Sequence, residues 1–305
     1  MFSRSICGCL AVIVVGCESF VTKDAKPTVN LNLVTASQFN HRGMVQNEEW
    51  VLVPDIGARL TPIRAYPTDE GGTFRVQSKG YLNLTEDTGD AWFPDGQGGK
   101  FSEIDLKADY SRRFEVMSWP IDMAAGVLSY VIPNGSFFPN GPRGSTTEIF
   151  GNLGSPIFSE EPYRFYPHFA VNYDPDEADG FYFNAGIGKG TLISEILDIF
   201  GLKPSGGFAA KVVDSLSFQI DVGVGYSSAR ESFWNYGLSE EGFADFTGTG
   251  TLSCKIDKNT VVSVGVGGSS IIDQDLRDWF DTINIENDNV WVIFGIGWEF
   301  GGASS

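Results

Sequence analysis

Residues 217–227 read Ser-Phe-Gln-Ile-Asp-Val-Gly-Val-Gly-Tyr-Ser, in which every second residue is apolar or aromatic. Successive side chains in a β-strand point to opposite faces, so this order puts the apolar residues on one face and small or polar residues on the other. About eleven residues suffice for a tilted strand to cross a bilayer. The stretch therefore predicts one strand of a transmembrane β-barrel.

The same alternation returns along the chain and predicts an all-β fold, an antiparallel transmembrane β-barrel of about twelve strands. We expect the strands near residues 29–38, 50–61, 74–84, 102–113, 120–131, 146–154, 164–173, 180–188, 217–227, 243–256, 261–269 and 290–300. An even number of strands brings the first and the last strand ends to the same side of the membrane, which we expect to be the periplasm.

The predicted connections differ in length between the two ends of the barrel. Four are long and polar: 85–100, 132–145, 229–242 and 270–289. Counting strands from a periplasmic N-terminus puts these four on the extracellular side and leaves mostly short periplasmic turns, as in bacterial outer-membrane barrels. Two connections break the rule, because the extracellular one at 174–180 is short and the periplasmic one at 189–214 is long.

Alternation alone does not tell which face meets lipid, because a soluble barrel that holds an apolar ligand alternates as well. Glycines gather on the polar face: Gly186, Gly188, Gly223, Gly225, Gly265, Gly267, Gly295 and Gly297. A soluble barrel would gain little from glycines on a solvent face, whereas a tight lumen uses them. Tyr110, Tyr173 and Tyr226 stand at the ends of apolar faces, as in the aromatic girdles of membrane barrels. We therefore expect the apolar face to meet lipid.

The last predicted strand carries a second membrane signal. Residues 295–300 read Gly-Ile-Gly-Trp-Glu-Phe and resemble the C-terminal assembly signal of outer-membrane proteins, with Gly295, Trp298 and Phe300 in the matching positions. In those proteins the phenylalanine usually ends the chain, whereas residues 301–305 follow it here. The resemblance implies the barrel assembly machinery as a partner.

The N-terminus predicts export. Residues 1–16 combine Arg4 with a short apolar stretch, the arrangement of a signal peptide. Val14-Val15-Gly16-Cys17 resembles a lipobox, where bacteria cleave before the cysteine and attach lipid to it, so Cys17 is a lipidation candidate. An ordinary signal cleaved near Ala25 is the alternative. The predicted division of the chain is a signal peptide at 1–16, a periplasmic segment at 17–27, the barrel at 28–300 and a short tail at 301–305.

Composition excludes several classes of protein. The 305 residues contain no run of ~20 apolar residues, so we do not expect a helical membrane protein. The formal net charge of −18 disfavours nucleic acid as a partner, because its phosphates would be repelled. Once the signal is removed and Cys17 is lipidated, Cys254 is left alone and forms no internal disulfide.

Three segments resemble the TorF-type porin family of bacterial outer-membrane β-barrels. Residues 37–46 read Ser-Gln-Phe-Asn-His-Arg-Gly-Met-Val-Gln and resemble its first-hairpin motif, in which a serine and an aromatic precede Arg-Gly and a later glutamine. Residues 103–111 resemble its acidic strand, with Asp109 where the family usually has glycine. Residues 126–133, with Thr147-Glu148, resemble its fifth and sixth strands. The resemblance spans most of the predicted mature chain and implies an outer-membrane barrel with a pore role.

Charged residues mark the expected lumen. In the strand at 102–113, the polar face carries Glu103, Asp105, Lys107 and Asp109. The further pore-lining candidates are Glu148, Asp221, Asp245 and Glu299, with Arg59, Lys107 and Lys255 as their candidate partners. Carboxylate rings favour the passage of cations. The alternative is a lattice of salt bridges that only fills the lumen, since side chains fill small barrels whereas large ones hold a channel.

The first predicted hairpin carries the Arg-Gly pair at its tip. Arg42 either folds into the barrel mouth against an acid such as Glu48 or Glu49, or it only shapes the turn. Gly43 permits that turn because glycine accepts a positive φ. We favour the structural role.

The long connection at 189–214 holds apolar residues at helical spacing: Leu192, Ile193, Ile196, Leu197, Ile199, Phe200 and Leu202. They predict an amphipathic helix. Such a helix lies on the inner leaflet, folds into the barrel mouth or caps the barrel end, and we favour the cap.

Enzymatic and metal-binding roles find little support in the sequence. An outer-membrane phospholipase needs His-x-Ser on one strand, but His41 precedes Arg42-Gly43 and His168 precedes Phe169-Ala170. Asp273 and Asp275 have a spacing that can bind calcium, yet their loop lacks the glycine and terminal glutamate of an EF-hand, so we favour solvated charge. We expect no enzyme, no cofactor and no metal site.

These observations predict a bacterial outer-membrane barrel that lets small solutes or ions pass passively, with a bias toward cations. The first alternative is a non-conducting barrel with a structural or surface-binding role. The second is a lipid-anchored soluble barrel that binds an apolar ligand. Outer-membrane lipid is an expected partner, and the sequence leaves the solute and the oligomeric state open.

Overall fold

The alternating segments form strands almost everywhere the sequence predicts them. A computed structural model describes residues 21–47, 49–65, 68–85, 98–117, 119–133, 145–156, 165–204, 206–283 and 285–301. The predicted signal peptide, Cys17 and the last four residues of the predicted tail lie outside these ranges.

Twelve long strands build the wall of a barrel. They are β1 (Val21–Ala36), β4 (Val51–Ala65), β5 (Thr68–Asn83), β6 (Phe101–Val116), β7 (Trp119–Val131), β8 (Ser145–Gly154), β9 (Tyr166–Asp174), β10 (Gly180–Leu192), β11 (Leu216–Ser227), β12 (Gly242–Lys255), β13 (Thr260–Ile271) and β14 (Asp288–Gly301). Each pairs antiparallel with its neighbours along the chain.

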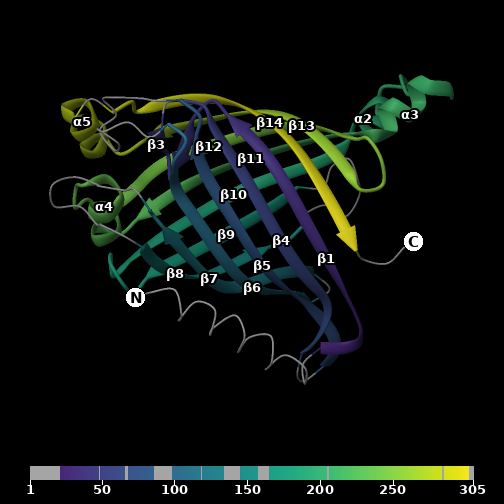
Figure 1. Cartoon of the computed structure of the whole chain (residues 1–305), viewed down its shortest axis with the longest axis horizontal. Coiled ribbons are helices and arrows are strands. Elements are labelled where there is room, and N and C mark those ends of the chain that lie inside the picture. The colour runs from purple at the N-terminus through teal and green to yellow at the C-terminus, as the bar shows by residue number, and fades with distance from the viewer. Residues whose placement is uncertain are drawn as a thin grey trace.

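The first and last strands close the barrel. β1 pairs with β14 from Thr28↔Gly301 to Ala36↔Ile293, and its other edge pairs with β4. The sheet therefore has no free edge, which satisfies every strand's backbone as a membrane span requires. The predicted antiparallel barrel is confirmed (Figure 1).

The first strand begins before the predicted start of the barrel. Residues 21–27, which we expect in a periplasmic segment, are part of β1, where Lys26 is opposite Thr61 of β4. The hydrogen-bonded partner strand β4 extends far enough to pair with them, which the composition of 21–27 alone does not reveal.

The outer face of the wall is apolar. Every barrel strand except β5 contributes a large apolar side chain that is more than a third exposed, for example Leu31, Ile56, Leu106, Val127, Ile149, Phe169, Ile187, Ile220, Leu252, Val264 and Val292. Tyr173, Phe181, Phe183 and Tyr226 stack along this face near one barrel end. An apolar band with aromatic residues at its border is the exterior of a membrane-spanning barrel, not of a soluble one.

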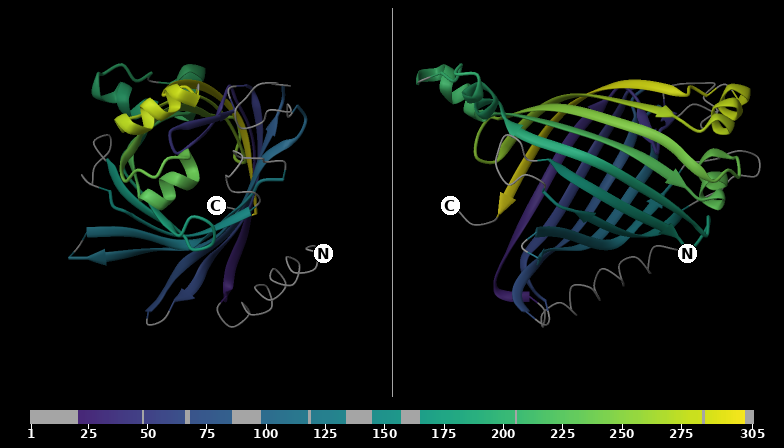
Figure 2. Two further views of the ribbon diagram at one scale, coloured as in Figure 1. Left: turned by 90° about the vertical axis from the view of Figure 1, so that its left-hand side faces the viewer. Right: turned by 180° about the vertical axis from the view of Figure 1, so that it is seen from behind.

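Shorter elements occupy the two ends of the barrel. At one end, which we call the α4 end, lie the hairpin β2 (Phe39–His41) and β3 (Met44–Asn47), helix α4 (Ala229–Tyr236) and helix α5 (Gln274–Ile283). At the opposite end, the α2 end, lie α2 (Ile193–Ile199) and α3 (Gly207–Ser215) (Figures 1 and 2). The connections at 229–242 and 270–289 thus share one end, and both predicted exceptions to the loop rule are present. Among the described residues, no helix is long and apolar enough to span a membrane.

The expectation that the 189–214 connection caps the barrel is wrong. α2 and α3 contact each other and the ends of β10 and β11, and they extend past the wall instead of across the opening (Figure 2).

Candidate functional site

Hydrogen bonds between neighbouring strands identify the inner wall. Asn32 on β1 and Gln77 on β5 donate to Asp55 on β4 over 3.2 and 2.8 Å. Arg75 on β5 donates to Asp109 on β6 over 3.0 and 3.3 Å. The face opposite the apolar exterior is therefore lined by polar and charged groups that bond across strands.

The four predicted residues of β6 all face this inner wall. Asp105 is opposite Lys79 of β5, Lys107 is opposite Gln77, and Asp109 is opposite Arg75. Asp109 is buried against Arg75, and the Lys107 Nζ lies 4.0 Å from the same carboxylate. Farther toward the α4 end, one buried carboxylate oxygen on each of Glu103 and Asp105 accepts no hydrogen bond. These two acids are therefore only partly satisfied.

Arg42 forms a buried ion-pair cluster at the α4 end. Its guanidinium pairs with Glu148 of β8 and Glu231 of α4 and lies 4.4 Å from the ring centroid of Tyr182. The side chain of Arg42 is 6% exposed, and those of Glu148 and Glu231 are 4% and 1% exposed. Tyr130 donates to Glu148 over 3.1 Å. The charge of Arg42 thus lies inside the barrel mouth, shared between two acids from separate elements.

The pKa values of the groups on the hairpin and α4 reflect this burial. Burial alone would lower the pKa of Arg42, but Glu148 and Glu231 raise it well above its ordinary value. Burial raises the pKa of Glu231, although Arg42 opposes the change. Burial, followed by the charges of Arg42 and Lys79, lowers the pKa of His41 to about 3. Arg42 therefore stays charged while its neighbour His41 stays neutral.

Main-chain contacts fix the turn that carries Arg42. Tyr236 of α4 donates to the Arg42 carbonyl over 3.0 Å, and Ser269 of β13 donates to the Gly43 carbonyl over 3.0 Å. Gly43 has a φ of +80°, and an added Cβ would collide with Asp245. Only glycine meets both conditions without strain. The predicted turn role of Gly43 is therefore right, but Arg42 also acts as a side chain.

Its partners differ from those expected. The sequence suggested Glu48 or Glu49 as acids for Arg42, whereas the contacts run to Glu148 and Glu231. Glu48 lies outside the described residues, and Glu49 accepts a weak 3.4 Å hydrogen bond from Thr85.

The first-loop hairpin, residues 39–47, is packed as a small core inside the barrel end. Met44, 1% exposed, belongs to one buried apolar cluster with residues of α4, α5, the adjoining strands and the loop after α5: Tyr236, Ala244, Ile271, Leu276, Phe280 and Ile285. On the other side, Phe39 stacks on Tyr81 of β5 with ring centroids 3.8 Å apart. The left view of Figure 2 shows this end, with α4 and the hairpin within the outline of the barrel. The hairpin therefore narrows the α4 end.

Asp245 of β12 lies directly beneath the hairpin. It is 1% exposed and accepts a hydrogen bond from Tyr182 over 2.9 Å. Thr247 lies at 3.5 Å from the second carboxylate oxygen. Asp245 thus adds a third acid, with neutral donors as its hydrogen-bond partners, to the region that Arg42 enters.

Asp221 and His168 meet across a strand of glycines. His168 on β9 and Asp221 on β11 are separated by β10, yet the imidazole Nε2 lies 3.8 Å from the carboxylate. A Cβ added to Gly186 would lie 2.5 Å from His168, and one added to Gly188 would lie 2.7 Å from Asp221. The side chains of His168 and Asp221 therefore occupy the space that side chains at Gly186 and Gly188 would fill. Both side chains remain partly exposed in the lumen.

Glu299 differs from the other pore-lining candidates. It pairs with Arg59 over 2.9 Å, and the two side chains are 51% and 43% exposed. This pair sits near the α2 end, because β14 and β4 both reach that end here. It does not join the acids around Arg42.

The residues of the predicted assembly signal and of the acidic loop lie outside the cluster around Arg42. Trp298 and Phe300 lie on the outer face of β14, opposite Leu31 and Val29, and Gly295 faces inward beside Ser263. In the acidic loop, Asp273 accepts a bond from the Leu276 amide over 3.0 Å at the start of α5. No group of three or more metal-ligating side chains gathers among the described residues.

Glu231, Tyr182 and Tyr130 are not among the site residues that the sequence predicts. Each shares the cluster around Arg42, but they come from three elements far apart in the chain. Tyr182 and Tyr130 could have been noticed because each stands on the polar face of a strand whose other face is apolar. Glu231 had no such signal, because it lies in a loop helix.

Comparisons with known proteins give structural likenesses only. No protein-family profile and no curated protein matches the chain. Among solved structures, it is similar to an outer membrane channel of Pseudomonas putida F1, with 10% identity over 90% of this chain and 95% of that one and a TM-score of 0.46. It is also similar to outer membrane phospholipase A of Escherichia coli, with 12% identity over 94% of this chain and 96% of that one and a TM-score of 0.44. A third similar structure is the KdgM porin, with 10% identity over 90% of this chain and 99% of that one and a TM-score of 0.40.

Proposed function

We propose that this protein is an outer-membrane channel for the passive passage of small solutes or ions. The observation that carries the proposal is the contrast between the two faces of the closed barrel. Its exterior is apolar on almost every strand, and its inner wall is lined by charged and hydrogen-bonding side chains. A wall of this kind favours a hydrated lumen over a dry one.

The charge of the lumen supports a preference for cations. Arginines neutralise some of the acids, as Arg75 does for Asp109 and Arg59 for Glu299. Among the described residues, Asp221 has His168 as its ion-pair neighbour in place of a lysine or arginine, and Asp245 accepts from a tyrosine. Carboxylates without a fixed cation attract mobile ones, so permeation would proceed by diffusion through an electrostatic filter, with no chemical step.

The first-loop hairpin would set the size limit. It occupies the α4 end, where Arg42 and Met44 fix it to the wall and to the loop helices. In the predicted orientation this is the extracellular end, so solutes would meet the hairpin first.

Single-channel recording of the refolded protein in a planar bilayer tests the proposal. We expect discrete conductance steps and a reversal potential that shows cation preference under a salt gradient. Asp221→Asn and Asp105→Asn should each reduce that preference. Asp288→Asn is the matched control, because Asp288 pairs with Arg277 on the loop surface and should leave selectivity unchanged. Silence from a folded, inserted protein would refute the channel.

A non-conducting barrel with a structural or surface-binding role is the second candidate. The buried packing around Met44 and Phe39 favours it, because a hairpin held this firmly can block the mouth. The same recording separates the two, since Arg42→Met should create conductance in a barrel that is silent only because of the hairpin. The lipid-anchored soluble barrel is disfavoured by the apolar exterior.

Export, lipidation and assembly complete the proposal. The signal peptide at residues 1–16 would direct export, the barrel assembly machinery would insert the chain, and lipid at Cys17 would tether the start of β1. Mass spectrometry of the purified protein tests the tether. An N-terminal peptide that begins at Cys17 and carries acyl groups supports it, and cleavage near Ala25 contradicts it.

A further inference from the structure

The α2–α3 segment, residues 192–216, exposes large apolar side chains. Phe208 is 83% exposed, Phe200 is 69% exposed and Leu202 is 66% exposed. Ile199 is 51% exposed, and Val212 lies on the same face of α3 as Phe208 because the two are four residues apart. Soluble loops rarely expose so much apolar surface, so these residues indicate a partner.

The segment lies outside the barrel, not over its opening. α2 and α3 contact each other and the ends of β10 and β11. In the right view of Figure 2 the helices extend from the wall beyond the strand ends, and in the left view they lie outside the ring of strands. The two helices therefore do not cover the opening of the lumen.

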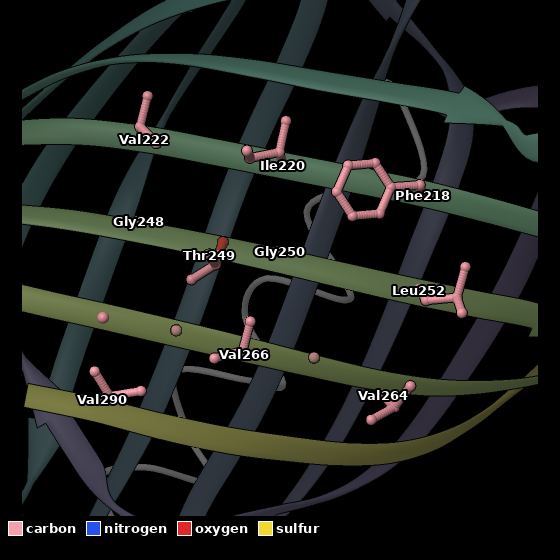
Figure 3. Close-up of a pocket in the computed structure, with 13 residues that line it drawn as sticks. Phe218, Ile220, Val222, Gly248, Thr249, Gly250, Leu252, Val264, Val266 and Val290 are labelled. Atoms are coloured by element: carbon pink, nitrogen blue, oxygen red, sulfur yellow. The ribbon is translucent and has the colours of Figure 1, made fainter. Parts of the chain in front are cut away.

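The apolar surface of the segment continues that of the barrel wall. β11 begins where α3 ends, and Phe218 and Ile220 stand on its exposed outer face. Figure 3 shows this part of the wall, where Gly248 and Gly250 of β12 have no side chains beside the β11 row. The resulting apolar hollow has a volume of about 730 Å³. The exposed apolar face of β11 thus leads directly along the chain into the helix that carries Phe208 and Val212.

The charges of the segment nearly balance, with three acids, Glu195, Asp198 and Asp214, against Lys203 and Lys211. Lys203 lies 3.7 Å from Asp214, and Glu195 is occupied at the start of α2, where it accepts from the Leu192 amide over 3.1 Å and from Thr191 over 3.0 Å. This leaves Asp198 and Lys211, which have opposite signs. A partner is therefore recruited by apolar contact, not by net charge.

We propose that the α2–α3 segment is an interfacial anchor that docks on the phospholipid leaflet at the α2 end. Ile199, Phe200, Leu202 and Phe208 enter the boundary between headgroups and acyl chains, while Asp198 and Lys211 stay in water. The anchor limits how far the barrel can move along the membrane normal and how far it can tilt away from it. The proposal rests on the barrel spanning a bilayer and does not require the lumen to conduct.

Spin-label accessibility in vesicles tests the anchor. A nitroxide is attached to Phe208→Cys or Leu202→Cys, in a full chain whose four native cysteines are replaced, and the protein is reconstituted in phosphatidylcholine. Oxygen concentrates in hydrocarbon, whereas a nickel chelate stays in water. We expect both labels to be more accessible to oxygen than to nickel. Lys211→Cys and Asp198→Cys are the matched controls on the same helices and should show the reverse order.

Each outcome decides the proposal. Nickel accessibility at Phe208→Cys that equals that at Lys211→Cys would overturn it, because the segment would then lie in water. Immobile labels shielded from both reagents would also overturn it and indicate a protein partner or a second copy. Adding phosphatidylglycerol or salt should leave the accessibilities unchanged, and a salt-dependent change contradicts recruitment by apolar contact. Conductance of the same labelled protein is read separately, so a failed channel and a failed anchor are distinguished.

Discussion

Replacing Arg42 by methionine should release the first-loop hairpin. The side chain has a similar length, but both Glu148 and Glu231 would lose their buried cation. Removing one partner of a buried ion pair costs ~3–5 kcal/mol, because an uncompensated charge stays behind. Since 1.4 kcal/mol corresponds to a factor of ten, the undocked hairpin should become roughly 100- to 4,000-fold more populated.

Thiol labelling of Met44→Cys measures this population. Met44 is 1% exposed, so a small water-soluble reagent reaches position 44 only when the hairpin undocks. The labelling rate is compared with and without Arg42→Met, in a chain without native cysteines. Channel recordings of the same variants should show a larger conductance when Arg42 is replaced.

Arg59→Met is the control for this experiment. Arg59 also pairs with a glutamate, Glu299, but both side chains are about half exposed. Exposed pairs contribute ~0–1 kcal/mol, so labelling at position 44 should change less than about fivefold. Equal labelling in wild type and Arg42→Met, with the barrel folded, would refute the reasoning and assign the docking to apolar packing around Met44.

Two further predictions use the glycine-lined wall and the neutral histidine. Gly267→Val should lower the free energy of unfolding by ~1–3 kcal/mol, because an added Cβ collides with the Trp291 ring. Gly190→Ala should leave it unchanged, because nothing lies within 4 Å of a Cβ added there. Denaturant titration in detergent measures both variants. Burial and the charge of Arg42 lower the pKa of docked His41 to about 3. Between this value and its ordinary pKa, His41 takes up a proton only when the hairpin is undocked. Docking is therefore fully stable above about pH 6.5 and should weaken by about 2 kcal/mol at pH 5. His41→Gln should remove this pH dependence of hairpin exposure, and its persistence would contradict the assignment.

The barrel strands could be predicted because lipid and water select residues at a period of two. The stretch at 217–227 corresponds to β11, Leu216–Ser227, within one residue at its start. Its outward Phe218 and Ile220 are exposed, and its inward Gly223 and Gly225 lie against Asn184 and Tyr182. A signal of this kind is local, so one sequence suffices to read it.

The partners of Arg42 could not be predicted because they are not local. Glu148 and Glu231 stand 106 and 189 residues further along the chain. They meet Arg42 only after the strands close into a ring and the first loop turns inward. The sequence offers only nearby acids such as Glu48 and Glu49 as examples of partners, because a local motif reveals only short separations.

The position of the α2–α3 segment was missed for a different reason. The spacing of Leu192 to Leu202 indicates a helix, and α2 covers most of it. An apolar helix face in water needs cover, which favours a cap on the barrel. Beside a bilayer, the lipid itself supplies the cover, so the same pattern fits a helix that points away from the protein.

The geometry of the α4 end ties the size limit of the lumen to its charge. Arg42 holds the hairpin in the mouth, and it also neutralises Glu148 and Glu231 there. Loss of Arg42 should therefore raise conductance and cation preference together, because the hairpin leaves and two carboxylates lose their cation. Glu231→Gln removes an acid and weakens the same contact, so it should raise conductance while lowering cation preference. A purely steric hairpin would give the same selectivity in both variants, and a purely electrostatic filter would give no change in conductance steps. The opposite selectivity of these two variants is thus the signature of one residue that performs both tasks.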